Sequence, residues 1–162
     1  MEFNYEPAKK KFLELLDNGL AKITQEEFDE KIQLHKKWLA GDDDGKQANF
    51  NRVSFENIDI SDVDLTKASF VYVSFTDMDI KNVDFKESMS LGILVKNTTF
   101  RNVQFKFSQL EVAFFKDVEF IESNIQNTTF IYSKLKNVNC INTMVRNVLS
   151  EKSFIDIKKQ YI

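Results

Sequence analysis

The feature that most constrains this chain is a nonpolar residue at every fifth position. From residue 50 to residue 145, 20 consecutive positions of this series are apolar with the single exception of Ser90. The residues two places earlier are all small, β-branched or Met, and none of these 40 positions is charged, although 29% of the chain is. Neither an α-helix, with its period of 3.6, nor an ordinary strand, with its period of 2, requires a repeat of five.

Two inward residues separated by one outward residue describe a short extended segment that is followed by a corner. One such segment cannot bury its own inner face, so the segments must stack coil upon coil as a solenoid of parallel strands about 4.8 Å apart. Hairpin-rich chains use many Gly and Pro residues in turns, but this chain has only 4 Gly and 1 Pro. The sequence therefore predicts an all-β solenoid whose corners are built by the repeat itself.

The outward residues indicate how many segments make one coil. Residues one coil apart stack, and outward apolar residues recur at an offset of about 20, as do the polar residues Asn57, Asp77, Asn97, Asp117 and Asn137. An offset of 20 gives four segments per coil, so we predict a four-sided tube of about five coils with a side-chain ladder at one corner. Because Ser90 replaces a large core residue and Gly92 follows it, we also expect a local bulge or a poorly filled layer there.

Residues 6–40 have a different pattern, which predicts two helices. The first has Pro7 in its first turn and ends near Gly19, and the second begins with Thr24 and Glu27 in capping-box spacing and ends at Gly41. We divide the chain into a helical cap with an acidic linker (1–46), a repeat tube (47–155) and a closing tail (156–162). The helices are expected to cap the first coil; the alternative is that they fold back over the side of the tube.

The units SDVDL, TKASF, KNVDF, IESNI and QNTTF resemble the pentapeptide-repeat family. Residues 34–50 also resemble the helical lead-in of some bacterial and phage members, and the resemblance extends to about residue 155. It implies a right-handed quadrilateral parallel β-helix. The chain departs from the family's commonest Ala-Asp-Leu units by being rich in Phe and Asn.

Composition excludes several classes of function. A net charge of −3 leaves no basic excess for a nucleic-acid backbone or an anionic membrane, and no run of 18 apolar residues or secretion signal is present. We therefore expect a cytoplasmic protein without direct nucleic-acid or membrane partners. Cys140 and His35 are the only residues of their types, so no disulfide, Cys/His metal site or nucleophile–base pair can be drawn. We expect no enzyme activity, catalytic residue, metal, cofactor or small-molecule substrate, and a packing role for His35.

Outward apolar residues on adjacent faces form the first candidate site, which we call the apolar stripe. Such a column is typical of an interface, either with a protein partner or in a homodimer, unless the N-terminal helices cover it. The stripe predicts a non-catalytic protein-binding or scaffolding module that presents a rigid repeat surface. Its residues are Val71, Tyr72, Met89, Leu91, Val112, Phe114, Ile131 and Tyr132.

The early coils carry the second candidate site, which we call the acidic patch. Some pentapeptide-repeat proteins mimic DNA and modulate type II topoisomerases such as gyrase, so the resemblance implies this alternative function for an acidic rod. Residues 48–155 contain 13 acidic and 12 basic residues, and this near balance argues against a DNA mimic. Outward carboxylates also usually form no more than a solvated face. The residues of the acidic patch are Asp59, Asp62, Asp64, Asp77, Asp79 and Asp84.

Overall fold

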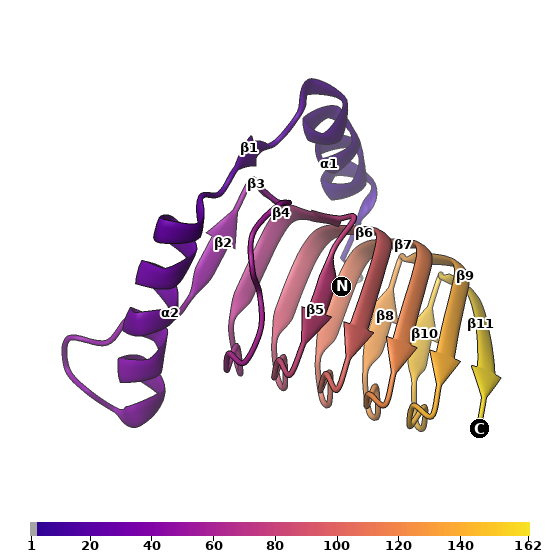
Figure 1. Cartoon of the computed structure of the whole chain (residues 1–162). Coiled ribbons are helices and arrows are strands. Elements are labelled where there is room, and N and C mark those ends of the chain that lie inside the picture. The colour runs from indigo at the N-terminus through magenta and orange to yellow at the C-terminus, as the bar shows by residue number, and fades with distance from the viewer. Residues whose placement is uncertain (1–2) are drawn as a thin grey trace.

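A computed structural model describes residues 3–162, so residues 1 and 2 of the expected cap segment lie outside the described residues. Two helices, α1 (Glu6–Asn18) and α2 (Gln25–Ala40), precede a tube of stacked coils (Figure 1). The strands are β1 (Ala21–Lys22), β2 (Asn49–Asn51), β3 (Val53–Phe55), β4 (Ser69–Thr76), β5 (Asp79–Lys81), β6 (Met89–Arg101), β7 (Gln109–Ile121), β8 (Thr129–Ile131), β9 (Lys134–Ile141), β10 (Leu149–Glu151) and β11 (Phe154–Gln160).

The strands pair in parallel with the predicted offset of 20 residues. Val73 lies opposite Ile93, which lies opposite Ala113. The fold is the predicted right-handed quadrilateral β-helix, with about six turns rather than about five. Strand β11 continues to Gln160, beyond the boundary expected at residue 155. We number the faces one to four, centred on Phe50, Phe55, Ile60 and Leu65 and on their equivalents in later coils.

A single left-handed residue forms each corner. Every fifth residue from Arg52 to Lys152 has a positive φ, between 47° and 62° for the non-glycine residues and 75° for Gly92. Eight of the 20 non-glycine corners are Asn, whose short polar side chain tolerates this conformation. Side chains at these corners also form the predicted ladder, since the Asn97 amide donates to Asp77 at 3.0 Å. The repeat thus turns the chain with few glycines.

The interior is a column of aromatic rings. Equivalent Phe residues of successive coils stack face to face, with ring centroids 4.4 Å apart for Phe55 and Phe75 and 4.7 Å apart for Phe85 and Phe105. Inward hydroxyl groups donate to carbonyl groups of the preceding coil, as Ser108 does to Phe85 at 2.7 Å. Small polar residues can therefore occupy the inner positions without leaving a buried polar atom unpaired.

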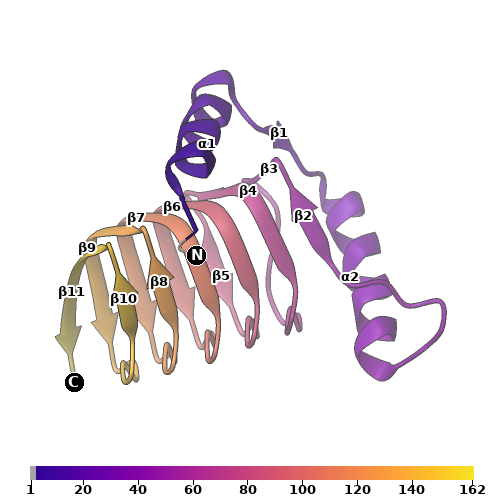
Figure 2. The same cartoon turned by 180° about the vertical axis from the view of Figure 1, so that it is seen from behind.

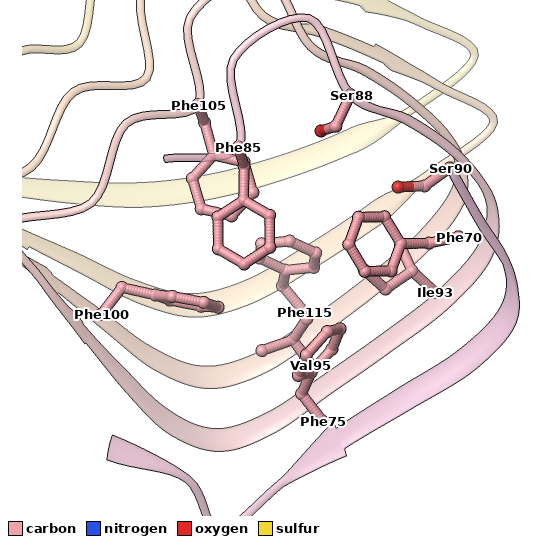
Figure 3. Close-up of a pocket in the computed structure, with 10 residues that line it drawn as sticks. All are labelled: Phe70, Phe75, Phe85, Ser88, Ser90, Ile93, Val95, Phe100, Phe105 and Phe115. Atoms are coloured by element: carbon pink, nitrogen blue, oxygen red, sulfur yellow. The ribbon is translucent and has the colours of Figure 1, made fainter. Parts of the chain in front are cut away.

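The layer at Ser90 is less disturbed than expected. Ser90 lies opposite Phe70 in regular register, so the expected bulge is absent from the pairing of β4 with β6. A cavity of about 10 Å³ lies among the rings beside Ser88 and Ser90, whose hydroxyl groups point toward the ring cluster (Figure 3). This volume is about that of a single water-sized sphere. The surrounding rings therefore fill most of the space that a Leu or Phe at position 90 would have taken.

Helix α2 closes the N-terminal end of the tube (Figure 1). Its buried Phe28 ring stacks on Phe50 at 5.9 Å and meets Phe55 edge-on at 6.3 Å. The predicted capping box of Thr24 and Glu27 is present at the start of the helix. The core of the first coil therefore continues into α2 instead of facing water.

Candidate interaction surfaces

Helix α1 lies along the side of the tube and not over its end (Figures 1 and 2). The expectation that both helices cap the first coil is therefore wrong for α1. Its only buried residue, Phe12, stacks between Tyr72 at 5.9 Å and Phe114 at 6.1 Å. A Cβ atom at Gly92 would lie 2.5 Å from the Tyr72 ring and 3.0 Å from the Phe12 ring. The missing side chain at position 92 thus leaves a slot for Phe12, which we call the Gly92 slot.

A second contact fixes the N-terminal end of α1. The Tyr5 ring stacks on Tyr132 at 5.9 Å, and the Lys9 ammonium group lies 5.6 Å from the centre of the Tyr132 ring. Burial, together with the negative charge of Glu111, raises the pKa of Tyr5, so its hydroxyl group is neutral at physiological pH. Tyr5 and Lys9 therefore hold α1 against the later coils, while Phe12 holds it against the earlier ones.

The contacts with α1 divide the apolar stripe into a covered part and an uncovered part. Tyr72, Phe114 and Tyr132 contact α1, and Val112, in the same corner column as Tyr72 and Tyr132, is fully buried. These four residues are not the exposed surface that the sequence predicts, because a helix packs against this corner. The remaining stripe residues lie on face one and are Val71, Met89, Leu91 and Ile131.

The uncovered part of the stripe borders a groove of about 220 Å³, which we call the face-one groove. Met89 is its most exposed apolar residue, with 59% of its surface accessible, and Val71 and Leu91 are half-buried beside it. Gln109 and Glu111 form a polar rim and are hydrogen-bonded to each other. The lining residues are Ser69, Phe70, Val71, Met89, Ser90, Leu91, Gln109 and Glu111.

The acidic patch is locally compensated. Asp79 pairs with Lys81 at 3.2 Å and with Arg101 at 3.1 Å. Asp84 pairs with Lys86 at 2.8 Å, and this ion pair raises the pKa of the Lys86 ammonium group. The other four carboxylates, Asp59, Asp62, Asp64 and Asp77, accept hydrogen bonds from Ser61, Asn82, the Thr66 backbone and Asn97, respectively. The local partners therefore weaken the negative field of the patch.

The two residues with the greatest chemical reactivity are both engaged in packing. Burial raises the pKa of the Cys140 thiol to about 11, so the reactive thiolate is scarce at neutral pH. The buried His35 ring accepts a hydrogen bond from the Ala48 N–H at 3.0 Å and donates one to the Thr66 carbonyl group at 3.0 Å. Within residues 3–162, no group of three or more His, Cys, Asp and Glu side chains is arranged to hold a metal ion.

No helix within the described part of the chain has the length and apolar character needed to span a membrane.

The sequence pattern did not predict the Gly92 slot. Gly92 stands out as a departure from the repeat, but its partner Phe12 lies in a different segment and looks like any apolar residue of an amphipathic helix. No local signal links the two positions.

Comparisons with known proteins agree with this architecture. The fold resembles that of QnrB1, a plasmid-mediated fluoroquinolone resistance protein, with a TM-score of 0.50 and 17% identity over 65% of this chain and 61% of that chain. This chain thus spans less than two thirds of the QnrB1 chain. Two pentapeptide-repeat proteins of cyanobacteria also match. Rfr23 of Cyanothece has a TM-score of 0.41 and 14% identity over 67% of this chain and 88% of that chain.

HetL of Nostoc, which is involved in the regulation of heterocyst differentiation, has a TM-score of 0.43 and 13% identity over 65% of this chain and 48% of that chain. No curated protein matches the sequence. The family model for pentapeptide repeats matches residues 48–86 in eight copies. This match identifies residues 48–86 as pentapeptide repeats, and the strands of the later coils keep the same offset of 20 residues.

Proposed function

We propose that the protein is a non-catalytic protein-binding module and that the face-one groove is its main contact surface. The main support for this proposal is that Met89 is exposed beside the apolar residues Val71 and Leu91. Methionine adapts its shape to a partner and is common at binding surfaces. A polar rim around an apolar centre is also the usual arrangement of an interface.

The tube gives this groove a fixed geometry. Its residues come from β4, β6 and β7, which pair in register, so Val71, Leu91 and Glu111 stand in one column. A preformed surface loses little conformational entropy when a partner binds. We therefore expect a scaffold that presents a rigid surface, without large changes in its backbone.

Paired substitutions test this proposal. Met89→Lys places a charge in the groove, whereas Met144→Lys changes a similarly exposed methionine, 52% accessible, outside it. Affinity capture from the native host followed by mass spectrometry should recover a partner with the wild type and the Met144 variant but not with the Met89 variant. If the partner is a second copy of this chain, light scattering should detect self-association of the wild type and the Met144 variant but not of the Met89 variant. Loss of the partner from both variants, or from neither, would contradict the proposal.

A second candidate function is modulation of a type II topoisomerase through the acidic patch. Two observations favour it: the fold is shared with a fluoroquinolone resistance protein, and Asp64 and Asp84 stack in neighbouring coils. The ion pairs of Asp79 and Asp84 weaken it. A supercoiling assay with gyrase should show an effect of the wild type that disappears when Asp59, Asp64, Asp79 and Asp84 become Asn. An unchanged effect, or none with the wild type, would exclude this function.

A further inference from the structure

We propose that three stacked lysines bind a short acidic segment of a partner protein. Lys96, Lys116 and Lys136 lie opposite one another on β6, β7 and β9, each one coil further along the tube. All three are exposed at the edge between faces two and three. Parallel strands are about 4.8 Å apart, so the three lysine side chains extend from neighbouring points on a line along the tube. We call this set the lysine ladder.

The lysine ladder lacks the acidic partners that three other lysines of the tube, Lys67, Lys81 and Lys86, have. Lys67 pairs with Glu87 at 3.6 Å, and Lys81 and Lys86 each pair with the carboxylate two residues earlier. No ion pair or hydrogen bond joins a ladder side chain to any other residue within 3–162. Like charges directly opposite each other in a sheet are destabilising. An anion bound along the ladder would remove this repulsion.

Apolar side chains accompany the lysines on face two. Leu94 precedes Lys96 by two residues, and Phe114 precedes Lys116 by two, so both point outward on the same face. Both are half-buried. Because the Phe114 ring stacks on Phe12 of α1, Leu94 is the apolar side chain of this pair that stands free of that contact, and it suits a segment that carries one apolar residue among its carboxylates.

Carboxylates mark the limits of the ladder. Asp77 and Asp79 stand in the preceding coil, and Asp156 stands in the following coil, where it accepts a hydrogen bond from the Asn137 N–H at 3.2 Å. Asp117 occupies the corner beside Lys116, so an anion would approach the ladder from the side of Leu94. Two coil spacings span about 10 Å, the length of three or four extended residues.

These limits favour a short acidic protein segment over a long polyanion. A nucleic-acid duplex placed along the ladder would extend over Asp77 and Asp79, where its phosphates would be repelled. The ladder also lies on a different face from the face-one groove, so this inference goes beyond the proposed function and can fail without it.

Fluorescence anisotropy with a dye-labelled peptide of four glutamates around one leucine tests the inference. The wild type should bind this probe at about 20 mM salt and lose most of the affinity at about 300 mM, because exposed charges are screened. Replacing Lys96, Lys116 and Lys136 together by Gln should weaken binding roughly tenfold or more. The matched control replaces the exposed Lys10, Lys36 and Lys158 by Gln and should change it less than about twofold.

A thermal melt supplies a readout that does not depend on the peptide. The ladder triple variant should melt no lower than the wild type, because it removes repulsion and no native contact. Equal weakening in both triple variants would overturn the inference, as would the absence of binding to the wild type. Tighter wild-type binding to a duplex DNA of about 20 base pairs than to the peptide would also overturn it, since a long polyanion would then be the preferred ligand.

Discussion

The two N-terminal helices differ in how they join the tube. Helix α2 buries Phe28 and His35 against the first coil and begins with a complete capping box. Helix α1 buries only Phe12, and its N-cap residue Tyr5 makes no side-chain capping hydrogen bond. The end of a solenoid exposes its core and needs a cover, whereas its sides are already closed. Helix α2 is therefore part of the hydrophobic core, whereas α1 is an attachment held at the Gly92 slot.

The largest effect on stability should come from Phe28→Ala. Removing a buried Phe ring from a packed core costs about 3–5 kcal/mol, and here the loss would also open the end of the tube. Urea denaturation should show a decrease of this size in the free energy of unfolding. The control Leu13→Ala removes an exposed side chain of α1 and should cost less than about 0.5 kcal/mol. A cost below about 1 kcal/mol for Phe28→Ala would mean that α2 is not part of the core.

Acid should weaken the attachment of α2 through His35. Burial lowers the pKa of His35 below its ordinary value of 6.5, and the Thr66 carbonyl group and the Asp64 charge oppose this shift only in part. The unfolded chain therefore binds a proton more readily than the folded one. The stability that the neutral ring provides is complete above pH 6.5 and is lost as the pH falls below 6.5 toward the folded pKa.

Two variants isolate this contribution of His35. His35→Leu would leave the Ala48 N–H and the Thr66 carbonyl group without partners, at a cost of about 1–3 kcal/mol. His35→Gln offers a donor and an acceptor but does not titrate, so it should flatten the dependence of stability on pH between 8 and 5. Denaturation curves at several pH values measure both effects. A Gln variant that keeps the full wild-type slope would place the titrating group elsewhere.

The capping box of α2 should contribute less. Thr24 accepts a hydrogen bond from the Glu27 N–H at 3.1 Å, and the Glu27 side chain accepts one from the Thr24 N–H at 2.8 Å. Thr24→Ala should lower the free energy of unfolding by about 1 kcal/mol, as is usual for such caps. Thr24→Ser retains the hydroxyl group and should restore most of this stability. Equal losses in both variants would show that the methyl group of Thr24, rather than its hydroxyl group, contributes the stability.

Much of the tube could be predicted from the sequence because its constraint is local and repeated. Each coil must place a large residue such as Phe75 or Phe100 inward at every fifth position, and the offset of 20 follows from which outward residues stack. The corner conformation was harder to foresee, because residues as different as Asn97 and Val112 adopt the same positive φ. Position in the repeat, rather than residue type, decides that conformation.

The candidate site could be predicted only in part, because it depends on a contact between distant segments. The stripe residues do lie near one another, but exposure depends on where α1 packs. Nothing near Phe12 in the sequence indicates that it packs beside Gly92, and nothing near Tyr72 indicates that a helix contacts it. A repeat pattern specifies what each coil contributes to its neighbours. It carries no information about a single helix that docks on the outside.

The smallest effect on the stability of the tube should come from Phe12→Ala. The Phe12 ring contacts Tyr72 and Phe114 from outside, so its loss leaves the inner ring column intact and should change the main unfolding transition by less than about 0.5 kcal/mol. Hydrogen exchange of residues 6–18 should nevertheless become much faster, because α1 loses its only buried side chain.

A second variant distinguishes loss of the slot from loss of the helix. Gly92→Ala keeps Phe12 but places a methyl group where the Tyr72 and Phe12 rings now lie, so the same acceleration of exchange in α1 should appear. If both variants instead lowered the main unfolding transition by several kcal/mol, α1 would be as much a part of the core as α2. If neither changed the exchange of α1, the contact of Tyr5 with Tyr132 would suffice to hold the helix.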